Sequence, residues 1–355
     1  MVTQKQIARE LGLAVSTVSR ALTGQPHVGE ATRKAVLTAA ERYGYRPNAV
    51  ARALRRRETR MIGVVIPDML NHFYAACTTV LQESFEDHGY GMLLAVTGND
   101  PQRERTALAR LRDAQVEGMV LVPSATPRST GPLDLPVVEM IRTSGRTQVD
   151  TVQCAEHETA AEAIGHLAAL GHRRIAVIAG EPEFSTTRER AAGAQAALAG
   201  LGLPPARVLT RDHTRAWGTE AMRRLVTGEE PPTAVFAASS ELALGALHEA
   251  QRLGIGIPGR LSLAALGNTD WFDVCRPPVT ACAQPLAEVG MISAQILLSR
   301  LAGARRSPSH IRVSGRLVVR GTTSAPGAGP DGDAPPEPRG TSAGGPANSP
   351  SGGLG

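Results

Sequence analysis

The sequence predicts an all-α helix–turn–helix headpiece followed by an α/β core of two doubly wound parallel-sheet lobes. Three short helical patterns fall within the first 45 of the 355 residues. From Met61 onward, short apolar runs alternate with amphipathic segments, which is typical of parallel strands covered by helices on both faces. The alternation continues past residue 260, too far for one doubly wound sheet of ordinary size, so we expect two lobes.

The headpiece is predicted from QKQIARELGLAVSTVSRALTG at residues 4–24. Thr3 followed by Gln6 is a capping-box start for the first helix. Ala8 is small enough for two helices to cross closely, and Gly12 can adopt the positive φ that ends the first helix. Val18, on the second helix, is expected to pack back between the two.

The second helix presents polar side chains near its N-terminus. That end of a recognition helix reaches base edges in a major groove, while flanking groups hold phosphates. A third helical pattern follows and ends at Gly44. The alternative is an ordinary helical hairpin, which the basic surroundings disfavour. The candidate contact residues are Val15, Ser16, Thr17, Ser19 and Arg20.

Residues 46–60 form an Arg-dense linker. The run from Asn48 to Leu54 could form a short helix, although it is too short to be stable alone in water. On DNA, Arg52 and Arg55 would meet phosphates, and Leu54 would act as an apolar wedge in the minor groove. A plain charged linker is the alternative.

The core elements follow from hydrophobic periodicity. The predicted strands are 61–66, 92–96, 119–122, 136–141, 174–180, 234–239 and 261–266. The predicted helices are 73–88, 101–115, 157–170, 186–201 and 240–253. Residues 324–355 contain 9 Gly and 7 Pro among 32, a composition that cannot bury a core, so we expect a disordered tail.

The charge is distributed unevenly. Residues 1–60 carry 12 Lys+Arg against 4 Asp+Glu, a balance of +8, whereas the whole chain has a net charge of +5. The remainder is therefore at −3. A basic head on a nearly neutral body suggests a polyanionic partner, with a merely solvated basic face as the alternative.

Several classes of protein are disfavoured. No apolar run is long enough to span a membrane, and the N-terminus lacks an apolar signal core, which predicts a cytoplasmic protein. The four cysteines are not spaced C-x-x-C, so we expect buried free thiols rather than a zinc site or disulfides. G-x-S-x-G, H-E-x-x-H and P-loop motifs are missing, so we expect neither catalysis nor a metal or other cofactor.

Two binding classes compete with a regulator. A sugar-binding transport protein would match the core alone, but the headpiece and the missing signal segment oppose it. A chromatin-like architectural protein would match the basic head, but such a protein has no need of a two-lobed core.

Longer motifs carry a family resemblance. TVSRALTG, VGEATRKAVLTAAERYGYRPNAVARALR, TRMIGVVIPD, GHRRIAVIAG and LGIGIPGRLSLAALG occur in the order and spacing of the LacI family of transcriptional regulators, over residues 3–323. The resemblance implies a repressor that binds near-palindromic operator DNA as a homodimer, sometimes a tetramer. It also implies a periplasmic-binding-protein-like core that takes a small-molecule effector.

The resemblance also divides the chain. The expected parts are a headpiece (1–46), a hinge helix and linker (47–60), a core (61–323) and the tail (324–355). The N-lobe would comprise 61–152 and 284–312, and the C-lobe 153–283 and 313–323. It assigns base contacts to Val15, Ser16 and Arg20, and DNA-backbone or structural roles to Thr17, Ser19, Tyr45 and Asn48. The full expected DNA-contacting set is Thr3, Val15, Ser16, Thr17, Ser19, Arg20, Asn48, Arg52, Leu54 and Arg55.

Two helix caps depart from the family pattern. Ala14 and Gly29 stand where the family has Ser caps, each loss costing on the order of 1 kcal/mol or less.

The resemblance places an effector between the lobes. The expected effector-binding residues are Phe73, Arg142, Arg190, His213, Ser239, Thr269 and Asp270. Four usually acidic positions are altered, within Met140–Arg142, Ala155–Glu156, Ala238–Ser240 and Gly267–Asp270.

Three interpretations of the altered pocket remain open. The effector could be anionic, such as a sugar acid or sugar phosphate that pairs with Arg190. It could be a neutral sugar held by Asp270, Glu156 and Ser240, with Arg190 paired internally. The protein could also have lost its effector response.

Overall fold

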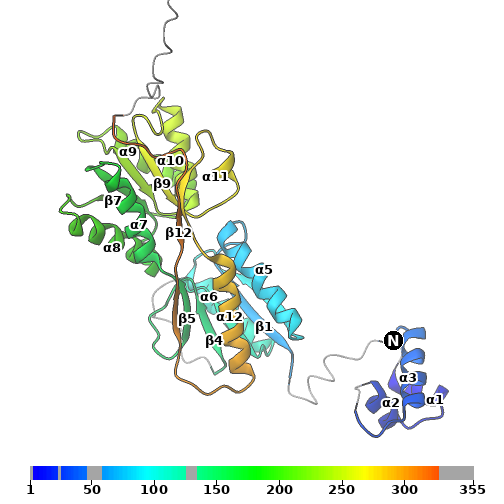
Figure 1. Cartoon of the computed structure of the whole chain (residues 1–355). Coiled ribbons are helices and arrows are strands. Elements are labelled where there is room, and N and C mark those ends of the chain that lie inside the picture. Colours follow the sequence, from blue (N-terminus) through cyan, green and yellow to red (C-terminus); the bar gives the residue numbers. More distant parts are fainter. Residues whose placement is uncertain (1–2, 23–24, 46–57, 125–133, 328–355) are drawn as a thin grey trace, which may run out of the picture.

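The headpiece is a three-helix unit with its own small core. The structure is a computed structural model that describes residues 3–22, 25–45, 58–124 and 134–327. Its first helices are α1 (Gln4–Glu10), α2 (Val15–Leu22) and α3 (Glu30–Arg42) (Figure 1). Ile7, Val18 and Val36, one from each helix, are fully buried together. Gly12 has a φ of +64°, which confirms the predicted end of the first helix.

The N-lobe is a six-stranded parallel sheet in the order β11-β5-β4-β3-β1-β2. Its helices cover both faces: α5 and α12 pack together on one, and α6 covers the other. The strands are β1 (Met61–Ile66), β2 (Gly91–Val96), β3 (Gly118–Leu121), β4 (Val137–Met140), β5 (Asp150–Cys154) and β11 (His310–Val313). The helices are α5 (His72–Asp87), α6 (Pro101–Asp113) and α12 (Leu286–Leu301).

The C-lobe repeats this plan with a second six-stranded sheet, β12-β10-β9-β8-β6-β7, in which the edge strand β12 is antiparallel. Helices α7 and α8 cover one face, and α9 to α11 cover the other. The strands are β6 (Ile175–Ala179), β7 (Arg207–Thr210), β8 (Ala234–Ala237), β9 (Ser262–Leu266), β10 (Thr280–Ala283) and β12 (Arg316–Val318). The helices are α7 (Glu156–Ala169), α8 (Ser185–Gly200), α9 (Arg215–Val226), α10 (Ser240–Arg252) and α11 (Trp271–Val274).

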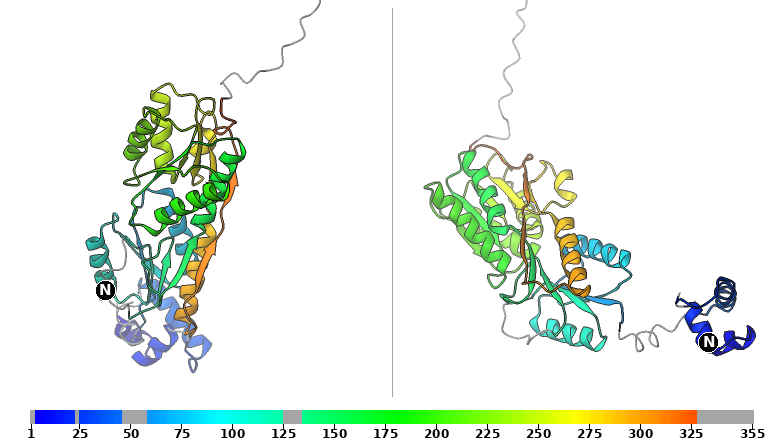
Figure 2. Two further views of the ribbon diagram at one scale, coloured as in Figure 1. Left: turned by 90° about the vertical axis from the view of Figure 1, so that its left-hand side faces the viewer. Right: turned by 60° about the horizontal axis from the view of Figure 1, so that its bottom comes forward.

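The chain passes between the lobes after β5, after β10 and after β11. Figures 1 and 2 show the lobes end to end, with β11 and β12 running from one to the other. Strand β5 pairs with β4 up to the residue pair Met140 and Val152, and with β11 up to the pair Val313 and Cys154. The first crossing therefore follows residue 154. The sequence predicts crossings after residues 152, 283 and 312; the strands before them end at Cys154, Ala283 and Val313.

The predicted fold class of two doubly wound lobes is confirmed, and each predicted core strand and helix is present within a few residues of its expected bounds. The analysis of periodicity missed β5, β7, β10, β11 and β12, because strands of three to five residues give too short an apolar signal. It also did not place α9, α11 or α12. Helix α12 is apolar on most sides because it packs against both the sheet and α5. Within the described residues, no helix is long and apolar enough to cross a membrane.

The cysteines largely follow the sequence prediction. Cys77, Cys154 and Cys282 are buried free thiols, whereas Cys275 is partly exposed. Burial raises the pKa of Cys77 and of Cys282 to about 12. These two thiols are therefore protonated and unreactive at neutral pH.

Ser324, the expected first residue of the tail, is partly buried and bonded to the C-lobe. Its backbone N–H donates to Ser262 Oγ at 3.0 Å, and its carbonyl accepts from Ser262 Oγ at 3.1 Å. The same carbonyl lies 2.9 Å from His172 Nε2, and the His172 side chain is itself buried. The contacts of the C-lobe thus extend into the segment that the sequence assigns to the tail, of which residues 328–355 lie outside the described residues.

Two truncations are expected to differ. Ending the chain after residue 327 should leave the melting temperature unchanged, because the deleted composition cannot pack. Ending it after residue 323 should lower the melting temperature by a few degrees, since Ser262 and His172 lose buried partners. Differential scanning calorimetry of both chains checks this. Equal melting temperatures would show that the Ser324 contacts contribute nothing.

Candidate functional site

Helix α2 exposes one face of the headpiece. Its buried residues are Val18 and Ala21, while Val15 is 40 % exposed and Ser16 and Arg20 are exposed. Thr17 and Ser19 are partly buried at the margins of this face. An exposed, polar, N-terminal half on the second helix of a helix–turn–helix is the geometry that enters a major groove.

The caps of the headpiece helices follow the sequence expectations in part. Gln6 Oε1 accepts from the Thr3 backbone N–H at 2.8 Å, the reciprocal half of a capping box. No side-chain cap bond forms at Gly29, the N-cap of α3. Ala14, before α2, offers only its carbonyl to the Thr17 and Val18 N–H groups. The predicted contacts Asn48, Arg52, Leu54 and Arg55 lie outside the described residues.

A cavity of about 690 Å³ lies between the two lobes, within the size range of small-molecule sites. Both lobes and the crossing segments line it. Six of the seven expected effector residues do so: Phe73, Arg142, Arg190, His213, Ser239 and Thr269. Residues that the sequence analysis did not place there include Asp68, Tyr74, Asn99, Thr186, Leu286 and Arg316.

Asp270 is not among the cavity-lining residues, so its assignment to the pocket is wrong. Gly267, with a φ of +107°, turns the chain after β9, and Asp270 then adopts helical dihedrals at the N-cap of α11. Its side chain is exposed as a result. Asn268 and Thr269, on the turn itself, contact the cavity instead.

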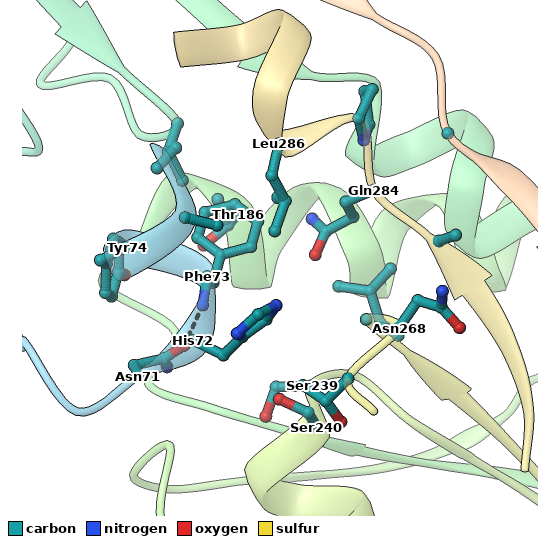
Figure 3. A pocket seen from close by; sticks show the side chains of 18 of the residues that line it. Asn71, His72, Phe73, Tyr74, Thr186, Ser239, Ser240, Asn268, Gln284 and Leu286 are labelled. Atoms are coloured by element: carbon teal, nitrogen blue, oxygen red, sulfur yellow. Dashed lines mark hydrogen bonds between the residues drawn. The ribbon is translucent and has the colours of Figure 1, made fainter. Parts of the chain in front are cut away.

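The N-terminus of α5 forms the N-lobe wall. The Asn71 side chain caps the helix by accepting from the Phe73 N–H at 3.0 Å. Figure 3 shows His72, Phe73, Thr186 and Gln284 around the same space, together with Leu286 from the start of α12. Aromatic and polar side chains therefore line the same cavity.

Arg190 on α8 is paired internally. Its Nε and Nη2 donate to the two Glu156 oxygens at 2.7 and 2.8 Å, and its Nη1 donates to the Ala238 carbonyl at 2.8 Å. Both side chains are almost fully buried. Burial opposes the charge of Arg190, but Glu156 outweighs it and raises the pKa of Arg190. Of the interpretations left open by the sequence, the one in which Arg190 is paired internally therefore describes this side chain, and an anionic ligand is not needed as its partner.

A helix crossing brings this pair together. A Cβ added to Gly193 on α8 would lie 2.0 Å from the carbonyl oxygen of His157 on α7. Only glycine allows the two backbones to approach so closely. Glu156 starts α7 beside His157, and Arg190 lies one turn before Gly193, so the crossing places their side chains in contact.

His213 lies over the end of β6. A Cβ on Gly180 would overlap its ring, so the glycine makes room for the imidazole. His213 Nδ1 lies 2.6 Å from Glu181 Oε2. Burial lowers the pKa of His213 more than Glu181 raises it, so the ring is neutral at pH 7 and donates its Nδ1 proton to the carboxylate.

The loop after β4, which carries Arg142, has a strained backbone at Ile141. Ile141 has a φ of +71°, which β-branched residues rarely adopt. Buried Glu139 holds the loop by accepting from the Ser144 N–H at 2.9 Å and from the Thr143 hydroxyl at 3.2 Å. Strain of this kind persists where surrounding bonds over-determine it, often at functional sites.

Hydroxyl and amide groups line the C-lobe side. Ser239 caps α10 by accepting from the Leu242 N–H at 3.3 Å, and Ser240 and Asn268 lie close by (Figure 3). Thr269 Oγ1 is buried and has no hydrogen-bond partner within the described part of the chain. A buried hydroxyl without a partner on a cavity wall is available to a ligand.

Comparisons with known proteins agree with both parts of the structure. Residues 3–48 match the model described as bacterial regulatory proteins, lacI family, and residues 164–323 match a periplasmic binding protein-like domain. The HTH-type transcriptional repressor CytR of Escherichia coli K12 is 32% identical over 329 residues, covering 91% of this chain and 96% of the relative.

Two solved structures are similar over the same extent. The transcriptional regulator CelR in complex with cellobiose is 26% identical, with a TM-score of 0.69, covering 91% of this chain and 100% of that one. The lac repressor dimer bound to operator and an anti-inducer is 24% identical, with a TM-score of 0.82, covering 91% and 99%. The similarity to the lac repressor, at 24% identity, shows a shared fold.

Proposed function

The chain belongs to the LacI family of bacterial regulatory proteins, and we propose that it is a sequence-specific DNA-binding transcriptional repressor controlled by a small molecule. The exposed N-terminal face of α2 on a separately packed three-helix headpiece is the observation that carries this proposal. The cavity between the lobes is the proposed binding site for the small molecule.

The proposed mechanism depends on two headpieces, one from each subunit of a homodimer. A homodimer presents two copies of α2 to successive major grooves, so its operator is nearly palindromic. An operator-bound dimer blocks transcription. A ligand that binds one lobe arrangement more tightly shifts the population toward it and thereby changes DNA affinity by the same coupling free energy.

Several parts of this proposal rest on the relatives. CytR is a repressor, the lac repressor structure is a dimer on operator DNA, and CelR was solved with cellobiose. By analogy this protein works on chromosomal DNA in the cytoplasm, with a sugar or sugar derivative as effector. Its groups have binding roles, and we assign it no catalytic activity.

The preference for operator over scrambled DNA, measured at one salt concentration, tests the proposed DNA function. An operator is selected from random DNA, and its affinity is compared with a scrambled duplex by fluorescence anisotropy at about 150 mM salt. A regulator should prefer the operator by about 10³-fold or more. Equal affinity for both duplexes would instead fit an architectural protein.

Arg20→Ala should weaken operator binding by about 1–3 kcal/mol and relax the preference at one position in each half-site, because a base contact carries sequence information. A binding panel with each half-site position varied in turn checks this. If all sequences weaken equally and the salt slope falls by about one, Arg20 contacts only a phosphate.

A further inference from the structure

Arg142 is a buried cation for which the described part of the chain supplies no ion-pair partner. The residue is 5 % exposed. Its Nη1 donates to the side-chain oxygen of Asn99 at 2.7 Å. Its guanidinium carbon lies 3.7 Å from the ring centroid of Phe184 and 6.0 Å from that of Tyr74. The guanidinium therefore lies near two aromatic rings and one neutral amide.

The nearby carboxylates are engaged elsewhere. Glu156 forms a bidentate pair with Arg190, and Glu181 accepts from His213. Among the described residues, no carboxylate oxygen lies within 4.0 Å of the Arg142 guanidinium. Burial lowers the pKa of Arg142, and the positive charge of Arg190 acts in the same direction; Tyr74, Glu181 and Glu156 act against this but do not reverse it. A buried charge is costly unless it is paired, so this site favours an incoming anion.

Arg142 also faces the cavity. Its side chain lines the cavity. Its Nε and Nη2 make no hydrogen bond within the described residues. Neither nitrogen is fully enclosed, so both are accessible to a ligand. These two nitrogens are the pair that a guanidinium uses for bidentate binding of an oxyanion. Rings that stack on the cation keep its plane fixed, which lowers the entropy cost of binding.

We propose that the effector of this regulator carries a carboxylate or phosphate group that pairs with Arg142. The proposal rests on the proposed function, since it names the ligand class of that same cavity. The hydroxyls of Ser240 and Thr269 and the amide of Asn268 take the remainder of the ligand, which is polar. Sugar acids and sugar phosphates combine these two chemistries.

An anion at Arg142 would act at the boundary between the lobes. Arg142 and Thr143 belong to the N-lobe loop, whereas Phe184 and Ser185 begin α8 of the C-lobe. The Thr143 N–H donates to Ser185 Oγ at 3.1 Å, beside the contact of Arg142 with Phe184. A ligand that binds the Arg142 guanidinium therefore changes the contact between Arg142 and Phe184, which joins the two lobes.

Matched pairs of ligands test the charge requirement on the full-length protein. Gluconate is compared with sorbitol, and glucose 6-phosphate with glucose, by thermal shift and calorimetry at constant ionic strength. We expect at least one anion to bind about tenfold or more tightly than its neutral partner. The two pairs distinguish a carboxylate from a phosphate. Equal binding within both pairs, or stabilisation by the neutral members alone, would overturn the proposal.

Variants assign the effect to one side chain. Arg142→Gln should abolish the preference for the anion, and Arg142→Lys should retain part of it. Arg316→Gln is the matched control, because Arg316 is the exposed cation on the cavity wall and its charge is screened by solvent. Loss of the preference in Arg316→Gln but not in Arg142→Gln would contradict the proposal, as would the absence of any Arg142-dependent response to either anion.

Operator binding is measured on the same variants and shows whether each one is folded. It also separates the two proposals. Normal operator binding without an Arg142-dependent anion response refutes the ligand class alone, whereas anion binding without operator preference refutes the regulator.

Discussion

Replacing Glu156 with glutamine is expected to destabilise the protein by about 3–5 kcal/mol. The substitution leaves Arg190 buried without a counter-charge, while its Nε and Nη2 keep at most one acceptor in place of two. Glu156 also accepts from Gln284 Nε2 at 3.1 Å, so the crossing segment after β10 loses a partner as well. Removing one member of a buried ion pair costs far more than the pair contributes.

Chemical denaturation of the wild type and the variant measures this loss. The matched control is Glu189→Gln on α8, the helix that carries Arg190. Glu189 pairs with Arg312 at 2.9 Å near the surface, so its substitution should cost less than about 1 kcal/mol. Replacing both Glu156 and Arg190 with apolar residues should recover much of the loss. A cost below that of the Glu189 control would show that Arg190 finds another partner.

Leu54→Ala is expected to weaken operator binding by several kcal/mol, or roughly a hundredfold in Kd, while leaving the melting temperature unchanged. An apolar wedge inserted at a base step supports a bend in the DNA, and alanine is too short to do so. The prediction comes from the family resemblance, since Leu54 lies outside the described residues.

Affinity for operator and for random DNA distinguishes a wedge from a linker residue. The family resemblance implies a wedge at the centre of the operator, so binding to random DNA should change little. Arg55→Ala is a useful comparison, because loss of a phosphate contact should weaken both DNAs and reduce the salt slope by about one. Equal losses on both DNAs in Leu54→Ala would refute the wedge.

Local pattern was sufficient for the headpiece and for most of the core. Gly12, Ala8 and Val18 predicted the helix turn because each is required by a contact within about ten residues along the chain. Longer elements such as α5 and α7 were predicted from their periodicity. Short strands such as β7 and β11 were not, because their formation depends on neighbouring strands rather than on their own residues.

The sequence by itself determined the fold class, the helix–turn–helix and the general position of an effector cavity, because these depend on periodicity, turns and motif order. Only the tertiary structure decided which buried cation of the cavity has no anionic partner among the described residues. Glu156 and Arg190 are 34 residues apart and meet because Gly193 lets α8 cross α7, whereas Arg142 lies on a loop between aromatic rings. The charge balance of a buried site depends on such long-range contacts, which spacing along the chain does not record.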